Sequence, residues 1–248
     1  MSKNKEMLSI FQKKRYLADN LDGFTDFHNH LLPGIDDGSN SVEETINLIS
    51  EFGKFGVKNF VSTPHVMGEY YPNTPETINE ALNLAKTNLP ATINIKAAAE
   101  YMMDQHFLEI LESNQILSIN DKHVLVEMSY FQPPININEI LFKLQNKSFK
   151  PILAHPERYP YLYSKSLHKF EELKSRGCRL QLNMLSLTRH YGPGIQKIAM
   201  QLLEKGLIDF LSSDCHRMEH LIKIQTIRLP YKKMNLLHPV LENSKNLF

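Results

Sequence analysis

Histidines and carboxylates stand directly after short apolar runs at many points in this chain. The first group is the segment D-F-H-N-H, where the alternate residues Asp26, His28 and His30 face the same side of an extended strand. Two imidazoles on one side can bind a single metal ion, although His-x-His alone is a weak signal. Residues of the same kind follow later apolar runs: His65, Glu100, Glu127, His155, Asp214 and His216.

If these side chains are buried together, they need a compensating positive charge, because unpaired buried carboxylates and imidazoles are costly. Divalent cations supply that charge. The donors are nitrogen and oxygen only, and they outnumber what one tetrahedral ion requires, which indicates two or three ions. Mixed sets of this kind suit Mn, Fe or Zn, and the sequence does not choose among them.

Other residues with useful chemistry lie close to these positions. Asp36 and Asp37 occupy the loop L-L-P-G-I-D-D-G-S-N, and Asp36 is predicted to be a turn residue with an Asx motif. Arg158 follows His155 in H-P-E-R-Y, where a guanidinium can hold two oxygens of a phosphate. Three tyrosines near predicted strand ends are candidates to line the mouth of a site: Tyr101, Tyr130 and Tyr159.

Seven β-rich runs alternate with helix-like segments, which predicts an α/β fold with a mostly parallel sheet. Such repetition favours a closed seven-stranded (β/α)7 barrel, with an open doubly wound sheet as the alternative. The carboxyl ends of the strands in a barrel converge on one face, and the ligands would meet there. The predicted strands span residues 24–28, 57–62, 92–99, 123–127, 150–154, 178–183 and 207–213.

Residues 1–22 are rich in lysine and precede the first strand, so they are predicted to form a helical N-terminal extension to a single domain spanning residues 23–248. The chain has 28 Lys and Arg against 27 Asp and Glu, which argues against a nucleic-acid partner. No apolar run approaches a transmembrane span or a signal-peptide core. Only Cys178 and Cys215 are present, so no disulfide framework exists, and a cytoplasmic protein is expected.

The segments DFHNHLLPGIDDGSNSVEET, STPH, AAAEY, VLVEMS, ILAHPERY and SSDCH, in this order and spacing, resemble the polymerase and histidinol phosphatase (PHP) superfamily. Within it they look most like the bacterial tyrosine-protein phosphatases associated with capsular and exopolysaccharide synthesis. The resemblance runs from about Phe24 to the C-terminus. It implies a distorted (β/α)7 PHP barrel, and a phosphotyrosine protein, a bacterial tyrosine kinase, as substrate and partner.

The same resemblance implies three divalent metal ions, with manganese preferred. Arg158, together with the ion held by Asp37 and His65, would neutralise the phosphate oxygens, and these three are the predicted catalytic residues. Relatives carry a second arginine several residues after the S-D-x-H segment, whereas here Arg217 follows His216 directly, so its substrate-binding role is doubtful. The three ligand sets carried over are His28, His30, Glu100 and Asp214; Glu100, Glu127 and His155; and Asp37, His65 and His216.

The predicted activity is therefore metal-assisted hydrolysis of phosphotyrosine, in which a water activated by the ions attacks phosphorus. A small-molecule phosphatase acting on histidinol phosphate shares every ligand and stays open as the alternative. A metal-stabilised binding protein without activity is a further alternative, and either a monomer or a homo-oligomer is compatible with the sequence. A cysteine-dependent phosphatase is excluded, because Met184 and Leu221 stand where it needs an arginine six positions after cysteine.

An amidohydrolase is disfavoured for a different reason. Such enzymes also begin with His-x-His, but they typically add a bridging lysine at the end of the fourth strand and an eighth strand. Glu127 stands at that strand end here.

Overall fold

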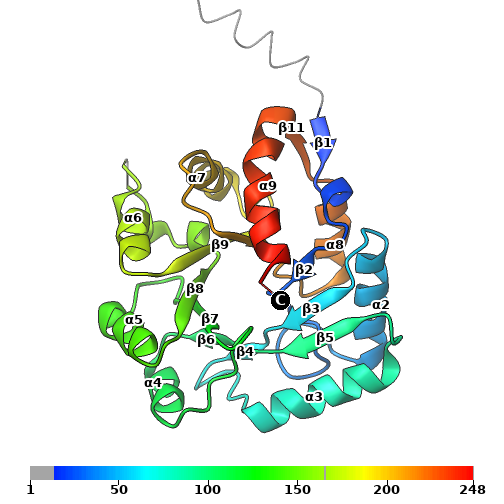
Figure 1. The fold of residues 1–248 in the computed structure, drawn as a ribbon, viewed down its shortest axis with the longest axis horizontal. Helices are drawn as coiled ribbons and strands as arrows, with labels where there is room; N and C mark the ends of the chain where they lie inside the picture. Colours follow the sequence, from blue (N-terminus) through cyan, green and yellow to red (C-terminus); the bar gives the residue numbers. More distant parts are fainter. Residues whose placement is uncertain (1–13, 165, 248) are drawn as a thin grey trace, which may run out of the picture.

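Parallel strands occupy the centre of the molecule and helices surround them (Figure 1). The structure is a computed structural model that describes residues 14–164 and 166–247. The strands are β1 (Lys14–Tyr16), β2 (Thr25–Asp26), β3 (Asn59–Ser62), β4 (His65–Val66), β5 (Asn94–Ala97), β6 (Glu100–Met102), β7 (His123–Glu127), β8 (Lys150–Ala154), β9 (Arg179–Asn183), β10 (Phe210–Ser212) and β11 (Arg228–Pro230).

The helices lie between the strands in sequence and outside them in space (Figure 1). The α-helices are α2 (Val42–Gly53), α3 (Pro75–Asn88), α4 (Gln105–Glu112), α5 (Ile137–Asn146), α6 (His168–Ser175), α7 (Pro193–Glu204), α8 (Met218–Gln225) and α9 (Tyr231–Lys245). Short 3-10 turns are η1 (Ala18–Asn20), η2 (Pro156–Arg158), η3 (Pro160–Leu162) and η4 (Met184–Leu187). The first two helices each begin at a capping side chain: Ser41 accepts a hydrogen bond from Glu44 N, and Thr74 accepts one from Thr77 N.

Each of the seven predicted runs contains a strand, and the prediction of an α/β fold with parallel strands is confirmed. The strands do not form one closed seven-stranded barrel in the described ranges. Their hydrogen bonds make two parallel sheets, one in the order β10-β9-β8-β7-β6-β4 and one in the order β2-β3-β5. The expected single ladder is therefore divided in two.

The division falls where β3 passes into β4 and β5 into β6. Thr63 and Pro64 interrupt the first pair, and proline has no N–H to donate to a ladder. The sheets stay connected there, because Ala98 N donates to Ser62 O at 2.8 Å and Glu100 N donates to Pro64 O at 3.0 Å. The break starts two short new strands whose first residues, His65 and Glu100, are paired in register.

The two sheets meet again where β2 and β10 end. Asn29 and Cys215 form an isolated parallel bridge, His30 N donates to Cys215 O at 2.9 Å, and Asp214 N donates to His28 O at 2.8 Å. These bonds bring the first and last predicted ligand segments side by side.

A buried carboxylate fastens this seam. Asp26 is fully buried and accepts hydrogen bonds from Ser212 Oγ at 2.6 Å, from Ser213 Oγ at 2.6 Å and from Ser213 N at 2.9 Å. Ser212 Oγ also accepts from His28 N at 2.9 Å, which fixes the strand that carries the histidines. Burial raises the pKa of Asp26, and these hydrogen bonds oppose that shift.

Two apolar clusters hold the strands in place. The larger one fills the space between strands and helices, and includes Val124 and Val126 of β7. The alternate residue Leu125 belongs to a smaller cluster drawn from both sheets, so it lies on the side where β7 ends in Glu127. The members of the smaller cluster are Phe27, Val61, Ala98, Ile119, Leu125, Ile152, Ala154, Phe210 and Leu247. The ligand end of the strands thus rests on a dry apolar layer.

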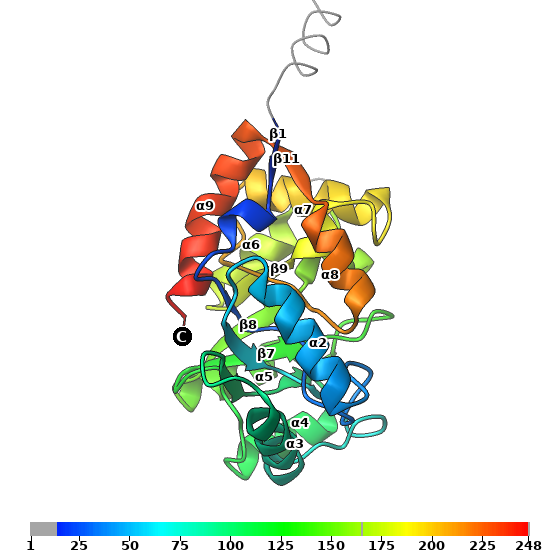
Figure 2. The ribbon, with the colours of Figure 1, turned by 90° about the vertical axis from the view of Figure 1, so that its right-hand side faces the viewer.

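The prediction of a helical extension over residues 1–22 is wrong for residues 14–16, which form the strand β1, whereas residues 18–20 form the short 3-10 helix η1. Residues 1–13 lie outside the described part. β1 pairs antiparallel with β11, and the two lie side by side at one end of the molecule (Figure 2). Leu17 and Leu21 are fully buried in the larger cluster. A strand partner far along the chain thus overrides the local helical preference. Among the described helices, none combines the length and apolar character of a membrane span.

We expect replacement of Asp26 by alanine to lower the free energy of unfolding by about 3 kcal/mol, because two buried hydroxyls and an amide lose their acceptor. Urea unfolding followed by circular dichroism measures this. Asp26→Asn should fall between wild type and Asp26→Ala, since the amide oxygen can still accept. The exposed Asp121→Ala is the matched control. Equal stability of Asp26→Ala and this control would contradict the role given to the seam.

Candidate metal centre

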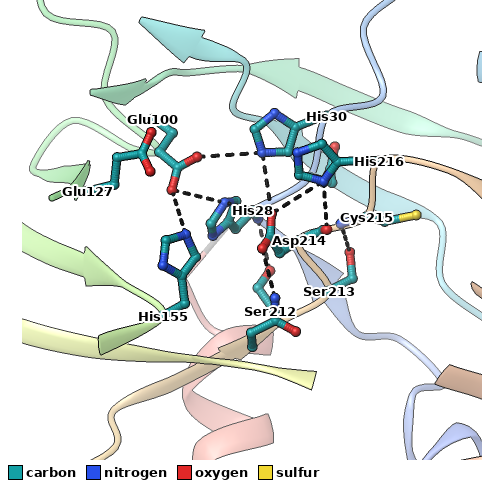
Figure 3. Close-up of polar contacts among 12 residues, drawn as sticks. His28, His30, Glu100, Glu127, His155, Ser212, Ser213, Asp214, Cys215 and His216 are labelled. Atoms are coloured by element: carbon teal, nitrogen blue, oxygen red, sulfur yellow. Dashed lines mark hydrogen bonds and ion pairs between the residues drawn. The ribbon is translucent and has the colours of Figure 1, made fainter. Parts of the chain in front are cut away.

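The nine residues predicted as metal ligands gather at the carboxyl ends of the strands, seven of them labelled in Figure 3. They come from both sheets and from the loops that follow. His28 and His30 follow β2, Asp37 precedes α2, His65 opens β4, Glu100 opens β6, Glu127 ends β7, His155 follows β8, and Asp214 and His216 follow β10.

Glu100 lies at the middle of the group and is fully buried. Its Oε1 atom is 3.3 Å from His28 Nε2 and 3.2 Å from His155 Nε2. Its Oε2 atom is 3.1 Å from His65 Nδ1 and 3.5 Å from His30 Nε2. The neighbouring imidazoles, led by His28, outweigh the effect of burial and hold the pKa of Glu100 well below its usual range.

Asp214 is the second central carboxylate. Its Oδ1 atom is 3.4 Å from His28 Nε2, 3.5 Å from His30 Nε2 and 3.5 Å from His216 Nδ1. Its Oδ2 atom accepts hydrogen bonds from Arg158 at 2.9 Å and from Asn183 at 2.7 Å. These partners, His28 first, hold the pKa of Asp214 well below its usual range despite burial.

Two other carboxylates lie beside His65, one of them exposed and one buried. The Asp37 side chain is 47% exposed, and its Oδ1 atom is 3.5 Å from His65 Nε2 and 3.4 Å from His216 Nε2. Glu127 Oε1 lies 2.9 Å from His65 Nδ1. His65 therefore has carboxylates on both sides of its ring, which suits a ligand placed between neighbouring ions.

Two ligand residues have a left-handed backbone. His155, the first residue after β8, has a φ of 34°. Asp214, the second residue after β10, has a φ of 51°. Residues other than glycine rarely adopt this backbone region, so the surrounding structure must enforce it. The turn bends each side chain from the line of the strand into the group.

Hydrogen bonds at Nδ1 orient two of the imidazoles. His28 Nδ1 lies 2.8 Å from Gln181 Oε1, and His216 Nδ1 lies 2.9 Å from the backbone oxygen of Asp214. Both partners are acceptors, so Nδ1 carries the proton and the lone pair of Nε2 faces the group. Partners of this kind are typical of histidines that bind metal ions. Sequence reasoning missed Gln181, because nothing local marks it.

Asp36 performs the same task for His30, whose Nδ1 lies 2.7 Å from Asp36 Oδ2. The predicted Asx turn is also present, since Gly38 N donates to Asp36 Oδ1 at 2.9 Å. His65 N donates to Oδ2 as well, at 3.1 Å. A Cβ on Gly38 would lie 2.1 Å from His30 O, so the loop can approach the histidine only with glycine at this position.

The donor set fits divalent cations. Several buried nitrogen and oxygen atoms of the group lie near one another, yet they form no hydrogen bond among the described residues. Such atoms are costly unless something else binds them. They are His28 Nε2, His30 Nε2, His65 Nδ1, both Glu100 oxygens, Glu127 Oε1 and His155 Nδ1. Four overlapping sets of donor atoms lie close enough to share an ion: His30, Asp37, His65 and His216; His28, His155 and Asp214; His28, His30 and Glu100; and His65, Glu100 and Glu127.

Arg158 lies against the group on the side of Asp214. Its guanidinium carbon is 4.8 Å from the ring centre of Tyr130 and 4.4 Å from that of Tyr191. The rings of Tyr130 and Tyr191 pack on the guanidinium. Together with the hydrogen bond to Asp214 they fix the direction of the remaining N–H donors of Arg158. Arg217 is exposed and precedes α8, and it is absent from the described lining of the cavity above the group. Tyr191 was not predicted.

That cavity has a volume of about 870 Å³, with Asp37, His65, Glu127 and His155 among its lining residues. Of the three predicted tyrosines only Tyr130 lines it. Tyr101 and Tyr159 are buried, and their hydroxyls accept hydrogen bonds from Leu117 N at 2.7 Å and Met128 N at 3.0 Å. Their role is structural. Aromatic and apolar walls are added by Tyr71, Tyr70, Phe131 and Met67.

Known proteins share this sequence and fold. The chain is 30% identical over 195 residues to the putative tyrosine-protein phosphatase CapC of Staphylococcus aureus, covering 77% of this chain and 76% of that protein. It is 28% identical over 200 residues to the tyrosine-protein phosphatase YwqE of Bacillus subtilis, covering 78% of each.

Solved structures agree with these relatives. A structure from a study of YwqE and of CpsB from Streptococcus pneumoniae, described as unique metal-dependent tyrosine phosphatases, superposes with a TM-score of 0.77 at 25% identity over 90% of this chain and 93% of that one. Histidinol phosphate phosphatase from Lactococcus lactis shares the fold, with a TM-score of 0.52 at 16% identity over 82% and 92% of the chains.

The family model for capsular polysaccharide synthesis proteins of the CpsB/CapC type matches residues 24–227, which include all nine predicted metal ligands. The earlier resemblance to PHP-type phosphatases is thereby confirmed. The chain belongs to the CpsB/CapC family.

Proposed function

We propose that this protein is a metal-dependent protein-tyrosine phosphatase that removes phosphate from a bacterial tyrosine kinase and so regulates polysaccharide synthesis or export. The observation that carries the proposal is a buried cluster of nitrogen and oxygen donors at the floor of an open cavity, with Arg158 beside it. The names of the relatives and the description of the family support the substrate and the process.

The cluster would hold three divalent ions, with manganese preferred. One set would be His28, His30, Glu100 and Asp214, and another would be Asp37, His65 and His216. His30 also lies close to this second set. The remaining set would contain Glu100 and Glu127. His155 was assigned to that set from the resemblance, yet its closest group in the structure contains His28 and Asp214, while His65 lies with the two glutamates. The place of His155 among the ions stays a prediction.

Bound divalent ions would lower the pKa of water and neutralise phosphate oxygens. The chain's own contribution is to orient the donors in advance. Gln181, Asp36 and the backbone oxygen of Asp214 fix three imidazoles through Nδ1. Asp37 and His65 would hold the outermost ion, where the phosphate enters.

Arg158 would bind the phosphoryl oxygens. Asp214 is its single hydrogen-bond acceptor in the described ranges, which leaves other N–H donors for a ligand in the cavity. Rings of Tyr130 and Tyr191 hold the guanidinium, so little entropy is lost when it binds phosphate. The stabilisation grows as charge develops on those oxygens.

The walls suit an aromatic leaving group. The Tyr71 ring stacks on His65 with centres 5.6 Å apart, and the Tyr130 ring stacks on His155 at 6.0 Å. A phosphotyrosine ring can lie between such faces. Tyrosine has an ordinary pKa of about 10, so its phenolate leaves without a strong general acid from the chain.

The proposal includes a cytoplasmic location, where a kinase could meet the enzyme. Cys178 and Cys215 are both free and buried, which agrees with a reducing compartment.

The first test is hydrolysis of a phosphotyrosine peptide and of histidinol phosphate by protein of measured metal content. We expect a higher kcat/KM for the peptide, loss of turnover on chelation, and recovery when Mn²⁺ is restored. His155→Ala should lower kcat/KM at least about a hundredfold, because a direct donor is lost. Preference for histidinol phosphate, or retained metal without turnover of either compound, would refute the proposal.

Arg158→Ala should lower kcat/KM for the peptide about a hundredfold or more, because a preorganised donor is lost where charge develops. Arg158→Lys should recover part of this, since lysine keeps the charge but not the planar pair of donors. Arg217→Ala is the control, and we expect it to change kcat/KM less than about twofold. Equal losses in the two alanine variants would contradict this assignment, because Arg217 would then contribute as much as Arg158.

Gln181→Leu should weaken metal binding by about tenfold to a hundredfold, because His28 loses the acceptor that fixes its tautomer. Gln181→Glu keeps an acceptor at this position and should bind metal more tightly than Gln181→Leu. Dialysis against graded chelator, followed by metal analysis, measures both. Identical metal content in Gln181→Leu and wild type at every chelator concentration would exclude this orienting role.

A further inference from the structure

Two separate segments of the cavity wall carry aromatic side chains that project into solvent. Tyr70 is 76% exposed and Phe131 is 95% exposed, yet both line the cavity above the ligands. They come from separate segments, one after β4 and one after β7. Exposed aromatic side chains beside a binding cavity indicate a surface that a partner covers.

Tyr70 is presented by a small, firmly held hairpin. Met67 N donates to Tyr71 O at 2.9 Å, and Tyr71 N donates to Met67 O at 3.0 Å, so residues 67–71 form the hairpin and Glu69 and Tyr70 lie at its tip. Gly68 N also donates to Asp104 Oδ2 at 3.2 Å. The tip is thus shaped before any partner binds, which reduces the entropy lost on binding.

A neighbouring amide secures the base of the hairpin. Asn73 Nδ2 donates to Ile35 O at 2.8 Å and to His65 O at 2.9 Å. The hairpin is therefore tied both to the loop that carries Asp37 and to a proposed ligand. Its position relative to the floor of the cavity is fixed.

The second segment, residues 129–131, is equally defined. Tyr130 packs on Arg158, and Tyr161 OH donates to Ser129 O at 2.6 Å. Phe131 N donates to Ser129 Oγ at 3.2 Å, and the Phe131 side chain itself points outward into solvent. Residues 129–131 therefore place one ring in the cavity and the following ring at its rim.

The outer wall is acidic. Glu69, Asp104 and Glu109 line the cavity on the hairpin side, with His106 Nδ1 3.9 Å from Glu109 Oε2. Arg158 is the one lysine or arginine in the described lining, and it is bonded to Asp214 at the floor. The floor also holds Glu127 Oε1, a buried atom with no hydrogen-bond partner among the described residues. A ligand must reach that floor past an acidic rim.

We propose that hairpin 67–71 and loop 129–131 bind the polypeptide on either side of the phosphotyrosine, and that they favour basic and apolar neighbours over acidic ones. This inference rests on the proposed function. Tyr70 and Phe131 cover apolar side chains or the flanking backbone. Glu69 and Glu109 attract lysine or arginine and repel aspartate or glutamate.

The test compares three substrates: N-acetyl-phosphotyrosine amide, and two phosphotyrosine peptides of equal length with either lysine or glutamate on both sides. We expect wild type to show a kcat/KM about tenfold higher for the lysine peptide than for the glutamate peptide at low ionic strength, falling as salt is added. In the double variant Glu69→Gln, Glu109→Gln the ratio should fall about fivefold. Glu80→Gln, exposed on α3, is the matched control and should keep the wild-type ratio.

The aromatic contribution is measured separately. Phe131→Ala should lower kcat/KM for both peptides roughly fivefold relative to the blocked amino acid, because the small substrate does not reach the rim. The control is Phe142→Ala on α5, which is 62% exposed and away from the cavity lining.

The outcomes separate the two levels of the argument. Turnover of the blocked amino acid with equal rates for the two peptides, or with preference for the glutamate peptide, would overturn this inference and leave the proposed function standing. No turnover of any phosphotyrosine compound by metal-loaded protein would overturn both. A lysine preference that persists in the double glutamine variant would also overturn the role of the acidic wall.

Discussion

The structure depends on keeping buried carboxylates and imidazoles together around Glu100. Two carboxylates in contact with several histidines are stable in a protein interior only when their charges are balanced and their atoms are satisfied. Glu100 has four imidazole nitrogens within 3.5 Å, and several of these atoms have no hydrogen-bond partner in the described part of the chain. The split sheets, the seam at Asp26 and the left-handed turns at His155 and Asp214 all serve to hold this group above a dry apolar layer.

The sequence predicts the parts of this arrangement that are encoded locally. Each predicted strand run contains a strand, and Glu127 and His155 lie at or just beyond the ends expected for them. The local sequence could not show whether the strands close into one barrel, because closure depends on which strands pair across the molecule. Pro64 lies just beyond the run predicted over residues 57–62, and local preference does not predict the short strand β4 that follows it.

Long-range partners explain the remaining differences. Residues 14–16 form a strand because β11 pairs with them. This pairing is not visible in the lysine-rich local sequence, which led to the prediction of a helix. Gln181 matters because β9 brings its amide to His28, and no spacing rule marks such a residue. Asp36 shows both sides of the problem: its turn geometry was predictable from the loop, whereas its bond to His30 requires the folded loop and Gly38.

Asp214 joins Arg158 to the group of histidines and carboxylates. Its Oδ1 atom faces the histidines, while its Oδ2 atom binds Arg158 and Asn183. Because one carboxylate contacts both, the positions of the guanidinium and of the histidines are linked through a single side chain. Asp214 has a positive φ at this junction, a conformation that the surrounding structure must enforce. If the proposed function holds, metal binding and phosphate recognition would be coupled through Asp214, and the outer walls would select the rest of the substrate.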